Sequence, residues 1–181
     1  MRILGINCMN HDAAMAVVEI KDGLGKILWA AHSERYSKIK NDHYLNQAIV
    51  DEAMTYGPFK KVVYYEKPWL KKTRQMYAGQ YGTALSYTEL PSWHLDHFGI
   101  KIDEYVKHHD SHAAAGYFTS PFREATILTV DAIGEWDTVS ISTAEKVWIE
   151  RKETIQYPHS IGILYSAFTH RCGLKPAEEE Y

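Results

Sequence analysis

Arg2-Ile3-Leu4-Gly5-Ile6-Asn7-Cys8 opens a pattern of short apolar runs and polar turns that decides the fold. This run is apolar enough for a buried strand, and the polar turn Met9-Asn10-His11-Asp12 follows it directly. Two further apolar runs, separated by a glycine-containing turn, complete an antiparallel meander. The three predicted strands are residues 2–8, 13–20 and 27–31. The first turn of this meander therefore carries a histidine and an aspartate.

The same arrangement recurs late in the chain, where a second meander has Ile133-Gly134-Glu135 in its first turn. Its predicted strands are residues 125–131, 136–143 and 146–154. Between the meanders, an apolar stripe predicts a helix at residues 44–56, and an apolar run predicts a strand at residues 61–66, which together make a βαβ-type step. The other predicted elements are helical pieces in residues 69–99, a strand at 105–107, and helices at 111–119 and 160–172.

These elements predict an α/β fold of the ribonuclease-H-like type, with a mixed sheet and flanking helices. In the actin, hexokinase and sugar-kinase superfamily, which is built from this layer, nucleotide phosphates lie against hairpin turns of the same kind. A length of 181 residues suits one compact domain. We therefore predict a single domain over residues 1–181.

Composition gives no support to several classes of function. The net charge is −3 without long runs of one sign, so nothing in the sequence favours binding to nucleic acid or to an anionic membrane surface. No apolar run is long enough to cross a bilayer, and no signal peptide is recognisable. The two cysteines, Cys8 and Cys172, lie far apart in the sequence. Reduced thiols and a cytoplasmic location are the expectation.

His108 and His112 form the main candidate metal site, because residues four apart share one face of a helix. Asp131, at the end of a predicted strand, is the best third ligand. Two imidazoles and one carboxylate would leave coordination positions open for substrate or water. The alternative is a solvated helix start, since the chain holds ten histidines and such a pair alone is not specific.

Several separated segments resemble the O-carbamoyltransferases of the nodulation-protein and antibiotic-tailoring family, whose first domain is similar to the tRNA threonylcarbamoyladenosine synthase subunit. The resemblance covers nearly the whole chain, in order. The segments that carry it are Leu4-Gly5-Ile6-Asn7, His11-Asp12-Ala13-Ala14, Glu34-Arg35-Tyr36-Ser37-Lys38-Ile39-Lys40, His108-His109-Asp110-Ser111-His112-Ala113, Ser120-Pro121-Phe122, Asp131-Ala132-Ile133-Gly134-Glu135, Pro158-His159-Ser160-Ile161-Gly162 with Tyr165, and Glu179-Glu180-Tyr181.

The resemblance implies that His108, His112 and Asp131 bind a divalent metal, iron(II) or else zinc or manganese. It implies transfer of a carbamoyl group from carbamoyl-adenylate, itself made from ATP, to a hydroxyl of a small-molecule acceptor. His11 would act as general base, because an imidazole pKa lies near the working pH, or would hydrogen-bond the carbamoyl group. Lys40 would stabilise negative charge that develops on the substrate. The simpler roles are a turn cap for His11 and a solvated loop residue for Lys40.

Nucleotide contacts are expected from the two turns and from the start of the last helix. The candidates are Asp12, Gly134, Glu135 and Ser160. Backbone capping is the commoner use of such aspartate and serine side chains. Ala132 stands where the family pattern Asp-Gly-x-Gly-Glu has its first glycine, which narrows the backbone angles open to this turn.

The resemblance also implies a longer enzyme, with a second lobe and a C-terminal domain that makes carbamoyl-adenylate. We therefore expect these 181 residues to be a first lobe that is inactive alone and that works with a separately encoded remainder or as a homodimer. The alternative is a non-catalytic module that binds metal or nucleotide, or that dimerises. A role in tRNA modification is weaker, because the charge balance gives no tRNA footprint.

Overall fold

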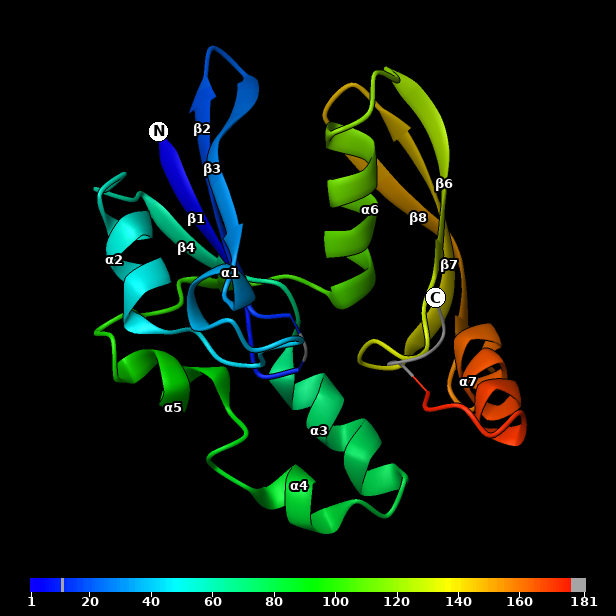
Figure 1. The fold of residues 1–181 in the computed structure, drawn as a ribbon. Helices are drawn as coiled ribbons and strands as arrows, with labels where there is room; N and C mark the ends of the chain where they lie inside the picture. Colours follow the sequence, from blue (N-terminus) through cyan, green and yellow to red (C-terminus); the bar gives the residue numbers. More distant parts are fainter. Residues whose placement is uncertain (11, 177–181) are drawn as a thin grey trace. The chain divides into compact units, whose positions relative to one another are not determined.

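The structure, a computed structural model, describes residues 1–10 and 12–176. Its contacts form two compact units (Figure 1). Unit 1 comprises Met1–Pro68 and Gln75–Val106, and unit 2 comprises Trp69–Arg74 and Lys107–Tyr181. Each unit is described by itself, and the expectation of a single domain over residues 1–181 stays a prediction.

Unit 1 is built on a five-stranded sheet in the order β3-β2-β1-β4-β5. Its strands are β1 (Arg2–Asn7), β2 (Ala14–Lys21), β3 (Leu24–His32), β4 (Lys61–Tyr64) and β5 (Glu104–Tyr105). The first three form the antiparallel meander, β4 lies parallel to β1, and β5 lies parallel to β4. This mixed sheet has the strand order and directions of a ribonuclease-H-like layer. The predicted fold class is confirmed.

The core of unit 1 lies between this sheet and α2 (Gln47–Met54). Leu4 and Ile6 of β1 pair with Val17 and Met15 of β2, and all four side chains are buried. The apolar side of α2, with Ile49, Val50 and Ala53, belongs to the same cluster. The helix begins at Asn46, whose side chain accepts the backbone N–H of Ile49 at 3.2 Å, as an N-cap does.

The remaining helices in and around unit 1 are short. They are α1 (Glu34–Ser37), α3 (Pro68–Tyr77), α4 (Tyr81–Leu85) and α5 (Pro91–Asp96). The last three occupy the region for which the sequence predicted helical pieces without clear bounds. Within residues 1–10 and 12–176, every helix is too short or too polar to span a lipid bilayer.

Unit 2 is built on a three-stranded antiparallel sheet in the order β6-β7-β8. The strands are β6 (Glu124–Val130), β7 (Asp137–Glu145) and β8 (Trp148–Gln156). α6 (His108–Phe118) covers one face of this sheet and contacts β6 and β7, whereas α7 (Ile161–Arg171) packs against β7 near its start (Figure 1). The second predicted meander is therefore present, and α6 begins three residues before the predicted helix start.

Candidate metal centre

The first turn of α6 is fixed by a carboxylate from the β6–β7 turn. Both oxygens of Glu135 face the backbone N–H of His108, at 3.1 and 3.2 Å, and the Glu135 side chain is 2% exposed. The first N–H groups of a helix have no partner within the helix, and the helix dipole favours negative charge there. Glu135 therefore stabilises the start of the helix that carries both candidate histidine ligands.

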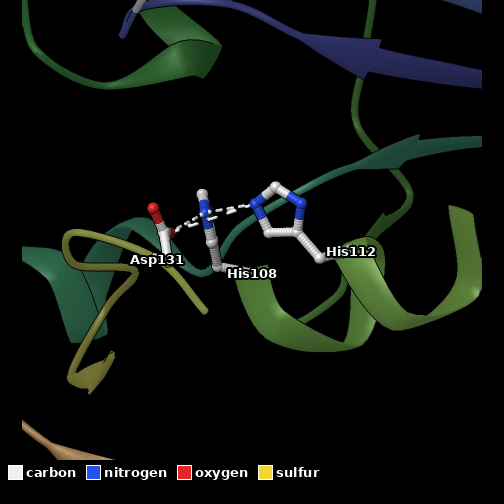
Figure 2. A group of neighbouring side chains, drawn as sticks. All are labelled: His108, His112 and Asp131. Carbon is white, nitrogen blue, oxygen red and sulfur yellow. Dashed lines mark hydrogen bonds and ion pairs between the residues drawn. The ribbon is translucent and has the colours of Figure 1, made fainter. Parts of the chain in front are cut away.

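His108, His112 and Asp131 converge on one point (Figure 2). The Nε2 atoms of the two histidines lie 3.0 Å apart. Asp131 Oδ2 lies 2.8 Å from His108 Nε2 and 4.0 Å from His112 Nε2. Among the residues that the structure describes, this is the one group of three such side chains close enough to hold a common ion.

Burial differs across the cluster. The His108 side chain is 9% exposed, that of Asp131 26% and that of His112 54%, so the cluster is closed on the His108 side and open on the His112 side. Burial acts to raise the pKa of Asp131, but the hydrogen bond and charge of His108, the backbone N–H of Ala132 and the charge of His112 outweigh it and lower the pKa to about 2. Asp131 is therefore ionised at neutral pH, as a metal ligand must be.

Residues at the start of α7 contact the turn that carries Asp131 and fix its position. Ser160 caps this helix by accepting the N–H of Ile163 at 3.0 Å, and its hydroxyl donates to the carbonyl of Ala132 at 2.6 Å. A Cβ atom on Gly162 would lie 2.5 Å from the Ala132 backbone and 2.6 Å from the Asp131 carbonyl. The helix thus rests directly on the backbone beside Asp131, and only glycine allows that approach.

Two further links hold α6 against the sheet, and sequence reasoning missed the sheet side chains that make them, which are Arg151, Asp137 and Ser140. Arg151 of β8 donates one hydrogen bond to Asp110 of α6 and another to Asp137 of β7. His109 is fully buried, and its Nδ1 lies 2.9 Å from Ser140 Oγ. The one signal in the sequence was an arginine at an inward-facing position of a strand, which requires a buried partner.

The predicted site residues fall in both units. Gly134, Glu135 and Ser160 surround the Asp131 turn in unit 2, where a Cβ on Gly134 would lie 3.1 Å from the His108 side chain. Lys40 is exposed in the loop after α1 of unit 1. Asp12 lies in the β1–β2 turn with φ of 50°, and its carbonyl accepts the Asn7 side-chain amide at 3.2 Å. His11 lies outside the described residues.

Comparison with known proteins identifies relatives over nearly the whole chain. Residues 96–181 match the family described as carbamoyltransferase N-terminus. The protein sll1178 of Synechocystis sp. is 31% identical over 208 residues, which cover 99% of this chain and 33% of its own. MJ1051 of Methanocaldococcus jannaschii is 26% identical, covering 98% of this chain and 31% of its own. Nodulation protein NolNO of Sinorhizobium fredii is 23% identical, covering 88% and 25%.

Among solved structures, the PPX-GPPA enzyme of Aquifex aeolicus aligns with 99% of this chain and 59% of its own, at 15% identity and a TM-score of 0.48. The chain spans about a third or less of the length of the curated relatives named above. The family resemblance predicted from the sequence is confirmed: residues 96–181 match the carbamoyltransferase N-terminus family, and the chain is similar to nodulation protein NolNO.

Proposed function

We propose that this chain is the metal-binding first part of an O-carbamoyltransferase that transfers a carbamoyl group from carbamoyl-adenylate to a hydroxyl of a small molecule. The convergence of His108, His112 and Asp131 carries the proposal. Three potential ligand atoms within 4.8 Å of one another, on the chain of a carbamoyltransferase relative, are hard to explain as a chance solvated helix start.

The donor set suits a divalent transition metal. Two neutral imidazole nitrogens and one carboxylate oxygen are the ligands of open iron(II) sites, and zinc or manganese accept the same set. The 3.0 Å separation of the two Nε2 atoms is close enough for both to bind one ion. Because His112 is half exposed, a substrate could approach from that side.

The proposed reaction joins the oxygen of the acceptor hydroxyl to the carbamoyl carbon and breaks the bond from that carbon to the phosphate oxygen of AMP. A divalent cation, when bound, supplies a Lewis acid for the carbonyl or phosphate oxygens. We propose that His11 takes the proton of the attacking hydroxyl and that Lys40 stabilises negative charge on the departing nucleotide.

We propose that Asp12 in the turn of the first meander and Gly134 in the turn of the second are nucleotide contacts, as the family resemblance implies. Glu135 and Ser160 would contribute by holding the second turn in place. This assignment is supported by their hydrogen bonds, since the Glu135 carboxylate accepts the His108 N–H and the Ser160 hydroxyl donates to the Ala132 carbonyl.

Metal analysis of the purified protein tests the proposal. Wild type should bind a divalent metal stoichiometrically, and His108→Ala and Asp131→Asn should each lose most of it because each removes one of three ligands. His43→Ala is the matched control, because His43 is an exposed histidine outside the cluster. Metal content unchanged in both ligand variants, with folding verified by circular dichroism, would contradict the site.

A second candidate is a non-catalytic module that binds metal or nucleotide. The chain covers 33% or less of the length of these relatives, so this module stays as the second candidate. The two candidates differ in one outcome. An enzyme part gains carbamoyl transfer when the remainder of such a relative is added, whereas a binding module keeps its metal affinity and gains no turnover.

A further inference from the structure

The loop of residues 33–46, which leads from β3 to α2, is bonded to both ends of the β1–β2 turn. At one end of the turn, the backbone N–H of Met9 donates to the carbonyl of His43 at 2.8 Å. At the other end, the N–H of Ala13 donates to the carbonyl of Asp42 at 2.7 Å. The 33–46 loop and the turn are therefore held side by side through their backbones.

Asp42 is a buried carboxylate within this loop, with 9% of the residue exposed. Its Oδ1 accepts the backbone N–H of Tyr44 at 3.0 Å, and its Oδ2 lies 3.5 Å from Ser33 Oγ. A carboxylate that accepts an N–H two residues further on fixes a turn of the chain. Because burying a charge is costly unless it is hydrogen-bonded, these contacts account for an aspartate at this position.

Ser33, at the other end of the loop, is fully buried and closes its base. The Ser33 hydroxyl donates to the carbonyl of Tyr44 at 2.6 Å and accepts the side-chain amide of Asn46 at 2.9 Å. The Ser33 N–H donates to the carbonyl of Ala13 at 2.7 Å. The first and last residues of the loop therefore meet, and they meet against the strand that follows the β1–β2 turn.

Lys40 lies on the exposed part of this closed loop. Two residues separate it from Asp42, so the two Cα atoms are within about 7 Å of each other. The neighbouring Lys38 ammonium donates to the carbonyl of Arg35 at 2.6 Å. Across residues 1–10 and 12–176, the Lys40 ammonium has no hydrogen-bond or ion-pair partner. The closed base thus carries a cation that is available to an anion.

We propose that Asp42 and Ser33 are positioning residues that hold the 33–46 loop on the β1–β2 turn and thereby place the Lys40 ammonium for a phosphate group of the nucleotide. This inference rests on the proposed role of Lys40 at the nucleotide. Ordering a loop and a long side chain on binding costs affinity. A loop that is fixed beforehand limits that cost to the lysine side chain, so neither positioning residue needs to touch the nucleotide.

The charge of Asp42 and its contacts act in opposite directions on anion binding. A carboxylate close to Lys40 repels an anionic ligand, so electrostatics alone predicts that Asp42→Ala strengthens nucleotide binding. Positioning predicts that the same substitution weakens binding, because the loop loses the acceptor that fixes it. A weaker affinity therefore cannot come from the loss of the charge.

Amide hydrogen exchange of the full chain, followed by NMR, tests the closure of the loop. The N–H groups of Met9 and Ala13 should exchange about fivefold faster or more in Asp42→Ala than in wild type, because the loop that accepts them opens more often. Asp42→Asn keeps an oxygen acceptor for Tyr44 and should restore most of the protection. Unchanged exchange at Met9 and Ala13 in Asp42→Ala would overturn the inference.

Titration with AMP, with EDTA present so that no metal contributes, tests the effect on binding. Lys40→Ala should weaken AMP binding about tenfold, because it removes a cation from the phosphate. Asp42→Ala and Ser33→Ala should each weaken it about threefold or more, whereas Asp42→Asn should stay within about twofold of wild type. Asp51→Ala removes an exposed carboxylate of α2 and should change the affinity less than about twofold.

A double-mutant cycle assigns the effect to Lys40. In the Lys40→Ala background, Asp42→Ala should change AMP affinity less than about 1.5-fold, because no ammonium is left to position. A merely structural role predicts the same loss in both backgrounds. Circular dichroism verifies folding, and Ser33→Ala takes the place of Asp42→Ala in the cycle if that variant does not fold.

Three binding results would overturn the inference: unchanged or tighter AMP binding by Asp42→Ala, an equal loss with and without Lys40, and no AMP binding by wild type. The proposed metal site is decided separately, because its three ligands lie in unit 2. A chain that binds metal but fails the AMP tests contradicts this inference alone. A chain that passes them but binds no metal contradicts the metal site alone.

Discussion

Gly162 has no side chain, and this allows α7 to approach the backbone of the Asp131 turn closely. Gly162→Ala would place a methyl group 2.5 Å from the Ala132 backbone, which real contacts do not tolerate, so α7 or the Asp131 turn must shift. We expect a loss of about 2–4 kcal/mol in the free energy of unfolding and weaker metal binding. Chemical denaturation and metal titration measure the two effects.

Gly116→Ala is the matched control for that variant. Gly116 lies in α6 on the exposed side, and a Cβ atom there would meet nothing within 4 Å. The substitution should raise stability by about 0.5–1 kcal/mol, because alanine favours the helix more than glycine does. Equal effects of the two substitutions would show that α7 does not rest on the Asp131 turn as described.

His94 gives unit 1 a pH dependence. Its Nε2 accepts the backbone N–H of Leu45 at 3.1 Å, and burial, with a smaller contribution from the nearby His97, lowers the pKa of His94 below its ordinary value of 6.5. The unfolded chain therefore binds the proton more readily than the folded one. Stability should fall as the pH drops through 6.5 and continue to fall until the pKa of the folded state is reached.

A non-titrating variant isolates this effect. His94→Gln can still offer an acceptor to Leu45 but takes up no proton, so its stability should change less than that of wild type between about pH 7.5 and pH 5.5. Urea denaturation at the two pH values measures the difference. A slope that is the same in wild type and variant would show that another group is responsible.

The three candidate ligands could be identified from the sequence, whereas the side chains that position them could not. His108 and His112 lie four residues apart, and Asp131 ends an apolar run, so local patterns revealed all three. Arg151 and Gly162 act through contacts with residues far away in the sequence, which no local pattern encodes. Glu135 was predicted to contact nucleotide, and its cap on α6 could not be foreseen for the same reason.

At the scale of elements, α6 is held to the sheet by a tether, the pair of ion pairs that Arg151 of β8 makes. Arg151 joins Asp110 of the helix to Asp137 of the sheet, and its side chain is 19% exposed. Arg151→Ala would leave the largely buried Asp137 without this partner, so we expect a loss of about 1–3 kcal/mol, discounted for the partial exposure of Asp110. Thermal or chemical unfolding measures the loss.

Arg151 contacts two carboxylates at once, and this provides a control for that prediction. Arg151→Lys keeps the charge but reaches only one carboxylate at a time, so it should recover part of the stability and not all of it. Lys152→Ala is the comparison at a neighbouring position, where the 2.6 Å ion pair with Glu150 is largely exposed and should contribute little. A loss from Lys152→Ala as large as that from Arg151→Ala would argue against the tether.

The two meanders were predictable because alternating apolar residues and glycine-containing turns specify strands locally. The start of α6 was predicted three residues late, since Lys107 gives no side-chain cap and the cap comes from Glu135 instead. The helices between residues 68 and 96 had no predictable bounds, because they are short and carry no regular apolar stripe. Packing within the fold sets their limits.

At the scale of the molecule, the chain alone should show little or no carbamoyl transfer from carbamoyl phosphate and ATP. The cluster is open on the His112 side, and an open site lets water compete with the acceptor hydroxyl. A coupled assay of carbamoyl transfer to a hydroxyl acceptor checks this, with His108→Ala measuring any background. Robust turnover that His108→Ala abolishes would contradict the prediction.

α7 has two features that are joined in one helix. Its first turn contacts the backbone beside Asp131, and its apolar side chains Ile161, Leu164 and Phe168 are exposed. A partner that restrains this helix therefore also restrains one of the three groups that would hold the ion. By thermodynamic reciprocity, each would raise the affinity of the other by the same factor. An ion bound at the cluster and a partner bound to α7 would therefore be coupled through this one helix.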